Sequence, residues 1–558
     1  MPAPEISTHQ DLRIPGFPDW FAGLLIRRGA STAQDVEQFL HPSLDQLHSP
    51  YLLHGLPKAV ERLLLARNNG ERIAIVGDYD VDGICGTAII SAVLRACGLE
   101  VETILPHRQI EGYGFQLPHV HEAIKRGCNL ILTVDCGTSS AVAATEALRE
   151  GLSVLITDHH LPSEKLPEDV IFINPHQIEC EYPFLDLSGA GLALKLAMAF
   201  SQACAKNIDA RRLLRIACLG TIADLVPLLG ENRTIAKLGL KALDNTSSTG
   251  LKALMEISKV RSPIMADDVG YRLGPRLNAP GRMSSADSSL ELLLSRDPAD
   301  SRRLALELDA ANRERQSWEK KVTADATQMF RGETSPILIG QSKGWHRGVI
   351  GIAAGRLAKE WNRPVILFSI DGGKAIGSGR SIPGIHLYNF LSQWKSQIPH
   401  FGGHDQAVGL TVPEVDLNHW REIWNNAANE WLPRIRLRQI IYEVSLQLDR
   451  INSETFLLLS RLEPFGQKNP RPLIRIQDTV RLKGRPRIFG DGHVSGEIEN
   501  LTSAASVKFI AWNWAKRLSQ MATTFEVIGT IDRDHFSGEV VWQIIDVKTR
   551  EFRCDNES

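Results

Sequence analysis

The sequence lacks a surplus of basic residues. Its 558 residues hold 63 Lys and Arg against 65 Asp and Glu, which gives a formal net charge of −2. Proteins that bind nucleic acid usually carry a basic surplus, so this balance argues at first against a DNA or RNA partner. Net charge is an average over opposing surfaces, however, and does not exclude one basic surface beside one acidic surface.

Two further absences bear on zinc binding and on location. The eight cysteines include no Cys-x-x-Cys pair and no zinc-like spacing, so we expect reduced and mostly buried thiols. No apolar run approaches the roughly 18 residues that span a bilayer. The first residues lack the basic and then apolar pattern of a signal peptide. The sequence therefore predicts a cytoplasmic protein without a membrane partner.

Alternating strands and helices dominate the residues that follow position 70. Apolar, β-branched stretches such as RIAIVG, NLILTV and LSVLIT each precede a polar cluster, and amphipathic helical segments separate them. Strands that alternate with helices predict an α/β fold with a mostly parallel sheet covered on both faces. A second α/β unit starts near SPILIG, and period-two stretches beyond residue 434 predict a small antiparallel barrel.

Changes of pattern divide the chain into five expected parts. They are an N-terminal helical segment (1–70), a parallel-sheet catalytic domain (71–285), a connecting helix (286–332), a second α/β domain (333–433) and a β-barrel (434–558).

Acidic residues and histidines gather after the predicted strands. Asp78, Asp80 and Asp82 lie in GDYDVDG, and Asp135 lies in TVDCGTSS. The sequence Asp-His-His occupies positions 158–160, and Asp224 follows an apolar stretch that we predict as a fourth strand. Because ligands bind outside the carboxyl ends of parallel strands, we expect these four clusters to meet at one edge of the sheet.

The chemistry of these side chains favours divalent metal ions. Carboxylates with imidazoles suit Mn²⁺ and Mg²⁺, and six or seven potential ligands are too many for one ion and about right for two. Two ions can activate a water and stabilise both oxygens in phosphate ester hydrolysis. A calcium loop is the alternative for GDYDVDG, but its twelfth position holds Ile89 where a Glu is needed. A solvated acidic turn and a capping role for Asp158 stay open for the single motifs.

These motifs resemble those of a known superfamily. GDYDVDG, VDCGTSS, DHH and IADLVPL are similar to the four motifs of the DHH phosphoesterases. GYRLGPRLNAPGRMSSADS, GWHRGVIGIAAGRL, SGRSIPGIHLYNFL and FGGHDQAVGL resemble the RecJ exonuclease family with its DHHA1 domain, and EPFGQKNPRPLI resembles the start of that family's OB-fold domain. The resemblance covers about residues 50–550. Cys136 and Val408 depart from it, standing where Asn and Ala are common.

The resemblance implies a 5′-to-3′ exonuclease on single-stranded DNA that depends on two Mn²⁺ or Mg²⁺ ions and acts in recombination and repair. It implies a helicase and a single-strand-binding protein as partners. The metal ligands that it implies are Asp78, Asp80, Asp82, Asp135, His159 and Asp224, and the catalytic residues are Asp80, Asp82, Asp135, His159 and His160. Asp135 is expected to bridge the two ions.

Further residues are candidates for holding the strand. We expect PRLNAPGR to form a loop whose arginines face phosphates, and Gly402 and Gly403 to precede a helix whose N-terminus receives an anion. The candidates in this part of the chain are Arg276, Asn278, Arg282, His346, Arg380, Gly402, Gly403 and His404. Without the resemblance, a surface turn explains these segments equally well.

The predicted barrel carries a basic track. Residues 471–487 hold six basic residues and one acid, and 434–438 add three more. Arg481, Lys483 and Arg485 are the expected strand contacts, because OB-fold grooves combine basic tracks with aromatic stacking. The candidate stacking residues are Phe489, Phe509, Trp512 and Trp514. A solvated charged face and buried core aromatics are the alternatives.

Two other functions stay open. A phosphodiesterase acting on short oligonucleotides would use the same cleft but would not need the barrel. A non-catalytic subunit that only binds DNA-repair proteins would not need the full set of acids and histidines.

Overall fold

The computed structural model describes residues 14–108, 111–112, 114–162, 165–431, 440–521, 524–534, 538–547 and 553–554. Contacts divide the chain into two compact units. The larger unit takes residues 49–224 and 240–438, and the smaller unit takes residues 1–48, 225–239 and 439–558. No helix in the described part of the chain is both long enough and apolar enough to cross a membrane.

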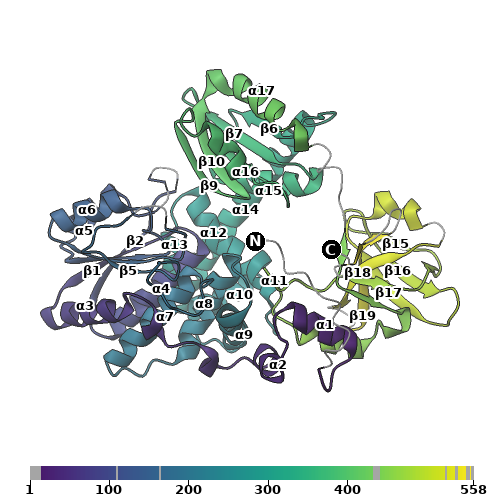
Figure 1. Ribbon diagram of the computed structural model, residues 1–558, viewed down its shortest axis with the longest axis horizontal. Helices are drawn as coiled ribbons and strands as arrows, with labels where there is room; N and C mark the ends of the chain where they lie inside the picture. The colour runs from purple at the N-terminus through teal and green to yellow at the C-terminus, as the bar shows by residue number, and fades with distance from the viewer. Residues whose placement is uncertain are drawn as a thin grey trace. The chain divides into compact units, whose positions relative to one another are not determined.

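The larger unit begins with a five-stranded parallel sheet. Its strand order is β2 (Glu100–Ile104), β1 (Arg72–Gly77), β3 (Leu130–Val134), β4 (Ser153–Thr157) and β5 (Ile171–Ile173). Helices α5 (Leu117–Lys125) and α6 (Ala141–Arg149) cover one face, and α4 (Val81–Ala96) and α7 (Gly189–Ala203) lie on the other (Figure 1). The central strands are buried on both faces, so the predicted α/β class with a parallel sheet is confirmed.

The predicted fourth strand before Asp224 is wrong. Residues Ala210–Ala223 form helix α8, and Asp224 ends it as the C-cap residue. A short continuous apolar run does not distinguish a buried strand from a buried helix, and here nine of the helix residues are buried (Leu213, Leu214, Ile216, Ala217, Cys218, Leu219, Gly220, Thr221 and Ile222).

Helices link this sheet to a second one. α12 (Gly274–Met283), α13 (Asp287–Leu294) and the long α14 (Pro298–Met329) lead to a sheet with the strand order β6 (Leu338–Ser342), β7 (Val365–Asp371), β8 (Lys374–Arg380), β10 (Ala407–Pro413) and β9 (His400–His404). Helices α15 (Arg347–Trp361) and α17 (Leu417–Ala427) pack in the same core as this sheet. The expectation of a second α/β unit is confirmed.

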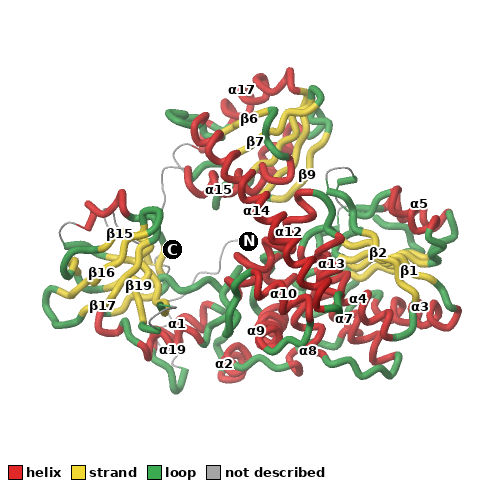
Figure 2. The backbone as a smooth tube through the Cα atoms, turned by 180° about the vertical axis from the view of Figure 1, so that it is seen from behind, coloured by secondary structure: helices red, strands yellow, loops and turns green. Residues whose placement is uncertain are grey.

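Two local expectations in this region are wrong. PRLNAPGR is not a loop but lies inside α12, with Pro280 within the helix (Figure 2). Gly402 and Gly403 do not precede a helix, because β9 and β10 form an antiparallel hairpin in which Gly403 pairs with Val408. A Cβ at Gly403 would lie 2.2 Å from the carbonyl oxygen of Ala407, so this glycine permits the hairpin. Val408, which departs from the family pattern, is buried in strand β10 of this hairpin.

The smaller unit is a mostly stranded body. Its main sheet has the order β12 (Val444–Leu446), β13 (Ile474–Ile476), β18 (Val527–Arg533), β19 (Val540–Val547), β17 (Ser506–Ala511), β16 (His493–Asn500) and β14 (Val480–Leu482), and β15 (Arg487–Phe489) pairs with β16. Two pairs, β12–β13 and β17–β19, are parallel, so the body is mixed and not wholly antiparallel as expected.

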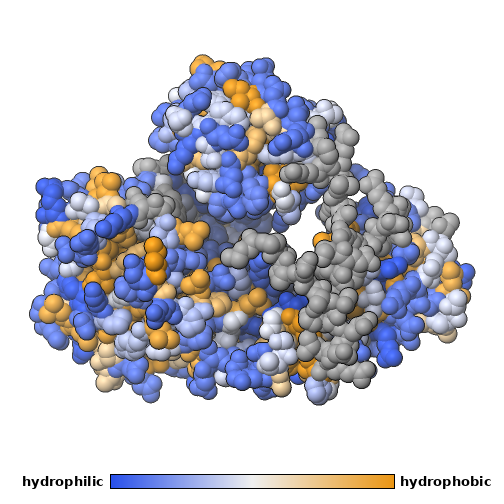
Figure 3. Space-filling view, in the orientation of Figure 1, coloured by the Kyte–Doolittle hydropathy of each residue, from blue (hydrophilic) through white to orange (hydrophobic). Residues whose placement is uncertain are grey.

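Helices α1 (Asp19–Arg27) and α2 (Ala33–Leu40) share the core of this stranded body. Two buried arginines link the N-terminal helical segment to the stranded body through hydrogen bonds. Arg28 donates to the side chain of Asn469 and the carbonyl oxygen of Pro470, and Arg233 donates to the carbonyl oxygens of Phe39 and Leu462. Such charges stay buried because carbonyl and amide oxygens replace their water. In the face of the molecule that Figure 3 shows, apolar residues are scattered among hydrophilic ones.

Candidate metal centre and strand-binding surfaces

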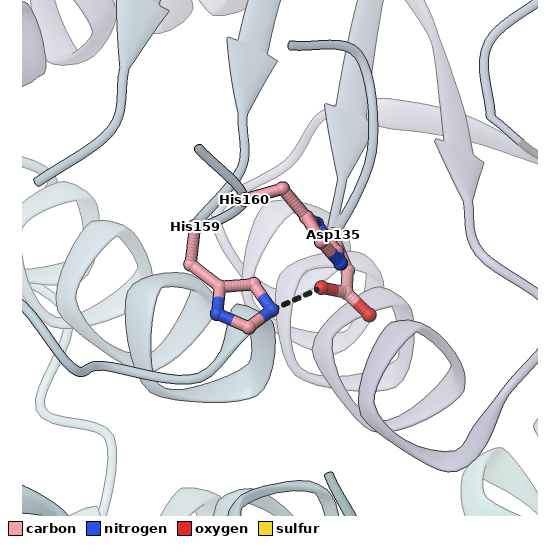
Figure 4. Close-up of side chains that lie close together, drawn as sticks. All are labelled: Asp135, His159 and His160. Carbon is pink, nitrogen blue, oxygen red and sulfur yellow. Dashed lines mark ion pairs between the residues drawn. The ribbon is translucent and has the colours of Figure 1, made fainter. Parts of the chain in front are cut away.

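Acidic residues and histidines converge at the carboxyl edge of the first sheet. The Nε2 atom of His159 lies 3.1 Å from Oδ1 of Asp135 (Figure 4). The same atom lies 3.6 Å from Oδ2 of Asp224 and 3.9 Å from Oδ2 of Asp82. Potential ligand atoms lie within 4.8 Å of one another in three groups: Asp82, His159 and Asp224; Asp78, Asp80 and Asp135; and Asp135, His159 and His160. The structure thus brings all the predicted metal-binding residues together.

Local structure explains how this cluster forms. Asp80 is the N-cap of α4, and its Oδ1 atom accepts hydrogen bonds from the N–H groups of Asp82 and Gly83. Asp82 in the first turn accepts hydrogen bonds from the N–H groups of Gly189 and Ala190, at 2.6 and 3.0 Å. The N-termini of two helices therefore face the acidic cluster, and their dipoles favour its negative charge.

Two glycines allow the backbone of neighbouring helices to lie close to the carboxyl groups of the cluster. A Cβ at Gly189 would lie 2.5 Å from the Asp135 carboxyl group, and one at Gly220 would lie 2.4 Å from Oδ1 of Asp82. Asp135 itself has a φ of 63°, in the left-handed region that few residues other than glycine adopt. Backbone strain of this kind persists where the surrounding structure enforces it, and functional sites are where it gathers.

Bound cations would stabilise the ionised form of the carboxyl groups in this cluster. Burial, followed by neighbouring carboxylates, raises the pKa of Asp82 and of Asp135 well above the usual range, and the same two causes raise the pKa of Asp224 to about 6. Burial lowers the pKa of His159 to about 4, so its imidazole is neutral and able to bind a metal.

Two buried polar atoms in the cluster have no hydrogen-bond partner among the described residues, Oδ1 of Asp78 and Nε2 of His159. Such atoms are rare in native proteins unless an ion or water meets them. The oxygen and imidazole donors fit Mn²⁺ or Mg²⁺.

His160 is held differently from His159. Its Nδ1 atom lies 2.7 Å from Oδ1 of the buried Asp158, and the ring is 47% exposed. Burial opposes the protonation of His160, but the hydrogen bond to Asp158 outweighs it and raises the pKa of His160 to about 9. Asp158 also accepts hydrogen bonds from the N–H groups of Thr138 and His159, so it orients the pair and is not a mere helix cap.

A second group of side chains carries positive charge. Burial lowers the pKa of Arg282 to about 9, and the charges of Arg108, Arg315 and Arg380 lower it further while Asp80 raises it. Burial, followed by the positive charge of Arg380, lowers the pKa of His404, so this imidazole adds a neutral hydrogen-bonding group beside the arginines. We call Arg108, Arg282, Arg380 and His404 the arginine cluster. Several gathered cations make an anion-binding surface, and the arginine fork suits phosphate.

Sequence reasoning found three members of the arginine cluster and missed Arg108. This residue follows β2, and its guanidinium lies 4.9 Å from the ring centroid of Tyr79. The rule that collects ligands at the ends of parallel strands applied to β2 as well, and would have found it.

Other predicted strand contacts have structural partners. Arg276 is ion-paired with Asp309 at 2.9 Å, and Asn278 lies half-buried on the same helix α12. His346 is the N-cap of α15 and accepts a hydrogen bond from Gly348. Cys136 donates a long hydrogen bond, 3.6 Å, to the buried carbonyl oxygen of Val76. The structure does not bring these residues into the metal cluster.

The smaller unit contains a groove of about 810 Å³, which we call the barrel groove. Its lining includes aromatic and basic side chains, namely Arg485, Arg487, Phe489, Lys508, Phe509, Trp512 and Arg533. Trp512 is 48% exposed, whereas Phe509 and Trp514 are buried. Of the three predicted basic contacts only Arg485 lines the groove. Arg481 and Lys483 form ion pairs with Glu499 and Glu497. Residues 434–438 lie outside the described part.

Three family models match the chain in order. They are the DHH family N-terminal domain over residues 72–221, the DHHA1 domain over 334–432 and the RecJ OB domain over 442–546.

Curated relatives and solved structures cover most of the chain. The single-stranded-DNA-specific exonuclease RecJ of Bacillus subtilis is 36% identical over 86% of the chain, which spans 62% of that relative's length. The protein of the same name from Dickeya dadantii is 35% identical over 89% of the chain and 90% of its own length. The structure of RecJ from Thermus thermophilus in complex with Mn²⁺ matches with a TM-score of 0.80 and 28% identity, over 95% of this chain and 76% of that one. Its Mg²⁺ complex matches with a TM-score of 0.75 and 26% identity, over 96% and 75%.

Proposed function

The chain belongs to the RecJ family of single-stranded-DNA-specific exonucleases, and we propose that it hydrolyses the phosphodiester bonds of single-stranded DNA from the 5′ end. The observation that carries this proposal is the metal cluster. Buried carboxylates and a neutral imidazole from distant segments converge there, and two of their polar atoms are left without a hydrogen-bond partner among the described residues. The alternative of a non-catalytic binding subunit accounts for none of this geometry.

The set of potential ligands is large enough to hold two ions. Asp78, Asp80, Asp82, Asp135, His159 and Asp224 would hold them. Bound Mn²⁺ or Mg²⁺ supplies a Lewis acid and lowers the pKa of water for attack on the phosphorus. Asp135 belongs to two of the three ligand groups, one with Asp78 and Asp80 and one with His159 and His160, which supports a bridging role. His160 is held by Asp158 through Nδ1, so Nε2 is the atom that can donate to a phosphate oxygen of the strand.

The arginine cluster supports binding of a terminal phosphate. Such a phosphate carries more negative charge than an internal one, and several guanidinium groups favour it. We infer that Arg108, Arg282, Arg380 and His404 receive the 5′ phosphate, while the barrel groove holds the strand further on by stacking and by phosphate contacts. A phosphodiesterase limited to short oligonucleotides would have no use for this groove.

Further residues contribute to strand binding in this proposal. They are Arg276, Asn278, His346, Gly402, Gly403, Arg481 and Lys483. The five-part division of the chain, a role in recombination and repair in the cytoplasm, and partnership with a helicase and a single-strand-binding protein rest on the family.

Digestion of single strands labelled at the 5′ or the 3′ end tests substrate, polarity and cofactor together. With Mn²⁺ or Mg²⁺ we expect early release of the 5′ label, little attack on blunt duplex, and no cleavage in EDTA. Release of the 3′ label first, or full activity in EDTA, would overturn the proposal.

A further inference from the structure

One buried amide joins three loops beside the metal cluster. Asn174 follows β5 and is fully buried. Its Nδ2 atom donates to the carbonyl oxygen of His160 at 2.8 Å and to Oγ1 of Thr138 at 3.2 Å, and its Oδ1 atom accepts from the N–H group of His176 at 2.8 Å. Thr138, His160 and Asn174 come after β3, β4 and β5, so the amide ties together the ends of three neighbouring strands.

The hydrogen bonds of this amide form a closed ring with Asp158. The N–H group of Thr138 donates to Oδ2 of Asp158 at 2.9 Å, and Oδ1 of Asp158 meets Nδ1 of His160 at 2.7 Å. Asn174 therefore holds both flanks of the Asp158–His160 pair. One flank is the loop that supports the carboxylate, and the other is the backbone of the histidine.

Asparagine is suited to this position by its mixed donors and acceptor. Because the partner of Oδ1 is a backbone N–H and a partner of Nδ2 is a backbone carbonyl, the orientation of the amide is fixed. An aspartate of the same size would turn a second acceptor toward the carbonyl oxygen of His160, which cannot donate. The position is thus sensitive to a change of a single atom.

We propose that Asn174 is a positioning residue that acts through His160, an inference that rests on the proposed function. The His160 side chain is 47% exposed and contacts the His159 ring, with the two ring centroids 4.5 Å apart, and its directional contact at Nδ1 is the hydrogen bond with Asp158. Losing a partner that orients such a group typically costs about 10- to 100-fold in activity. The loss falls on kcat, because Asn174 is buried away from the strand.

The first test compares Asn174→Asp with Asn469→Asp in the full chain. Asn469 is the control for a change at a buried amide, since it is also fully buried and also donates from Nδ2 to two carbonyl oxygens, those of Leu462 and Pro464, while its Oδ1 accepts from the guanidinium of Arg28. We expect both variants to unfold at lower temperature. Only Asn174→Asp should lower kcat on saturating 5′-labelled strand, by about 10- to 100-fold, with KM and the activating Mn²⁺ concentration unchanged.

The second test separates positioning from general damage. In a His160→Ala background, adding Asn174→Asp should reduce the residual rate by less than about twofold, because the group that it positions is gone. A full second reduction, a changed KM at normal kcat, or wild-type kcat in the single variant would refute the inference. If the aspartate variant does not fold, Asn174→Ser removes the amide and keeps a small polar group for the same comparison. Wild-type cleavage is measured first, so failure of the exonuclease assignment is seen separately.

Discussion

The carboxyl edge of the first sheet and the barrel groove were both expected from clusters of charge in the sequence, yet the structure treats them differently. At the sheet edge, every predicted metal ligand joins the cluster. On the barrel, Arg481 lies directly opposite Glu499 in the β14–β16 pairing, and Lys483 pairs with Glu497. Parallel topology alone gathers strand ends. The charge of a barrel surface depends on which acids face the basic residues across strands, and sequence order does not reveal it.

The largest expected effect is at Asp135, in the metal cluster at the sheet edge. Asp135→Asn should lower cleavage by roughly 10³-fold or more, because it removes a carboxylate that belongs to two of the three ligand groups. Strand affinity, measured by fluorescence anisotropy in Ca²⁺, should stay within about twofold of wild type if the barrel groove binds independently. The exposed N-cap variant Asp209→Asn is the matched control. Cleavage by Asp135→Asn within about tenfold of wild type would contradict a shared ligand.

Substitution of two tryptophans tests whether the barrel groove binds the DNA strand. Trp512→Ala should weaken single-strand affinity by about 1–3 kcal/mol, the worth of one stacked base, without lowering the melting temperature, because Trp512 is half exposed in the groove. Trp514→Phe alters a buried ring that packs under Arg517, so it should lower stability and leave affinity nearly unchanged. Equal affinity losses in the two variants would mean that the groove has been misplaced.

The smallest expected difference is between two arginines of the basic track. Arg485→Ala should reduce the slope of log affinity against log salt by about 0.7, the value for one lost phosphate contact on a single strand. Arg481→Ala should change the slope less, because Glu499 already neutralises Arg481. If both substitutions reduce the slope equally, the Arg481–Glu499 ion pair opens when the strand binds. Arg481 would then be a strand contact, as the sequence predicted.

Sequence patterns predicted the fold class and the convergence of the acidic residues and histidines because both follow from repeated local signals. Alternating strands and helices predict the parallel sheet, and the sheet then places the residues at its edge. The failures share another cause. The helix before Asp224 was predicted as a strand because an apolar run fits both, and the Gly402–Gly403 hairpin was predicted as a helix start because paired glycines fit both. Arg108 and Asn174 also follow strands, β2 and β5, but they escaped notice because only acidic residues and histidines were sought at the strand ends.

The alternation of the chain between its two units has a consequence for protein synthesis. The last residue of the larger unit is 438. The residues that pack against α1 and α2 lie in the last part of the chain and are synthesised later. For example, Asn469, which binds Arg28, lies 441 positions after it. At roughly 5–20 residues per second, these two apolar helices remain uncovered on the ribosome for tens of seconds. We therefore expect the metal-binding unit to fold first on the nascent chain. The N-terminal helices are then the segment most exposed to aggregation and most dependent on chaperones.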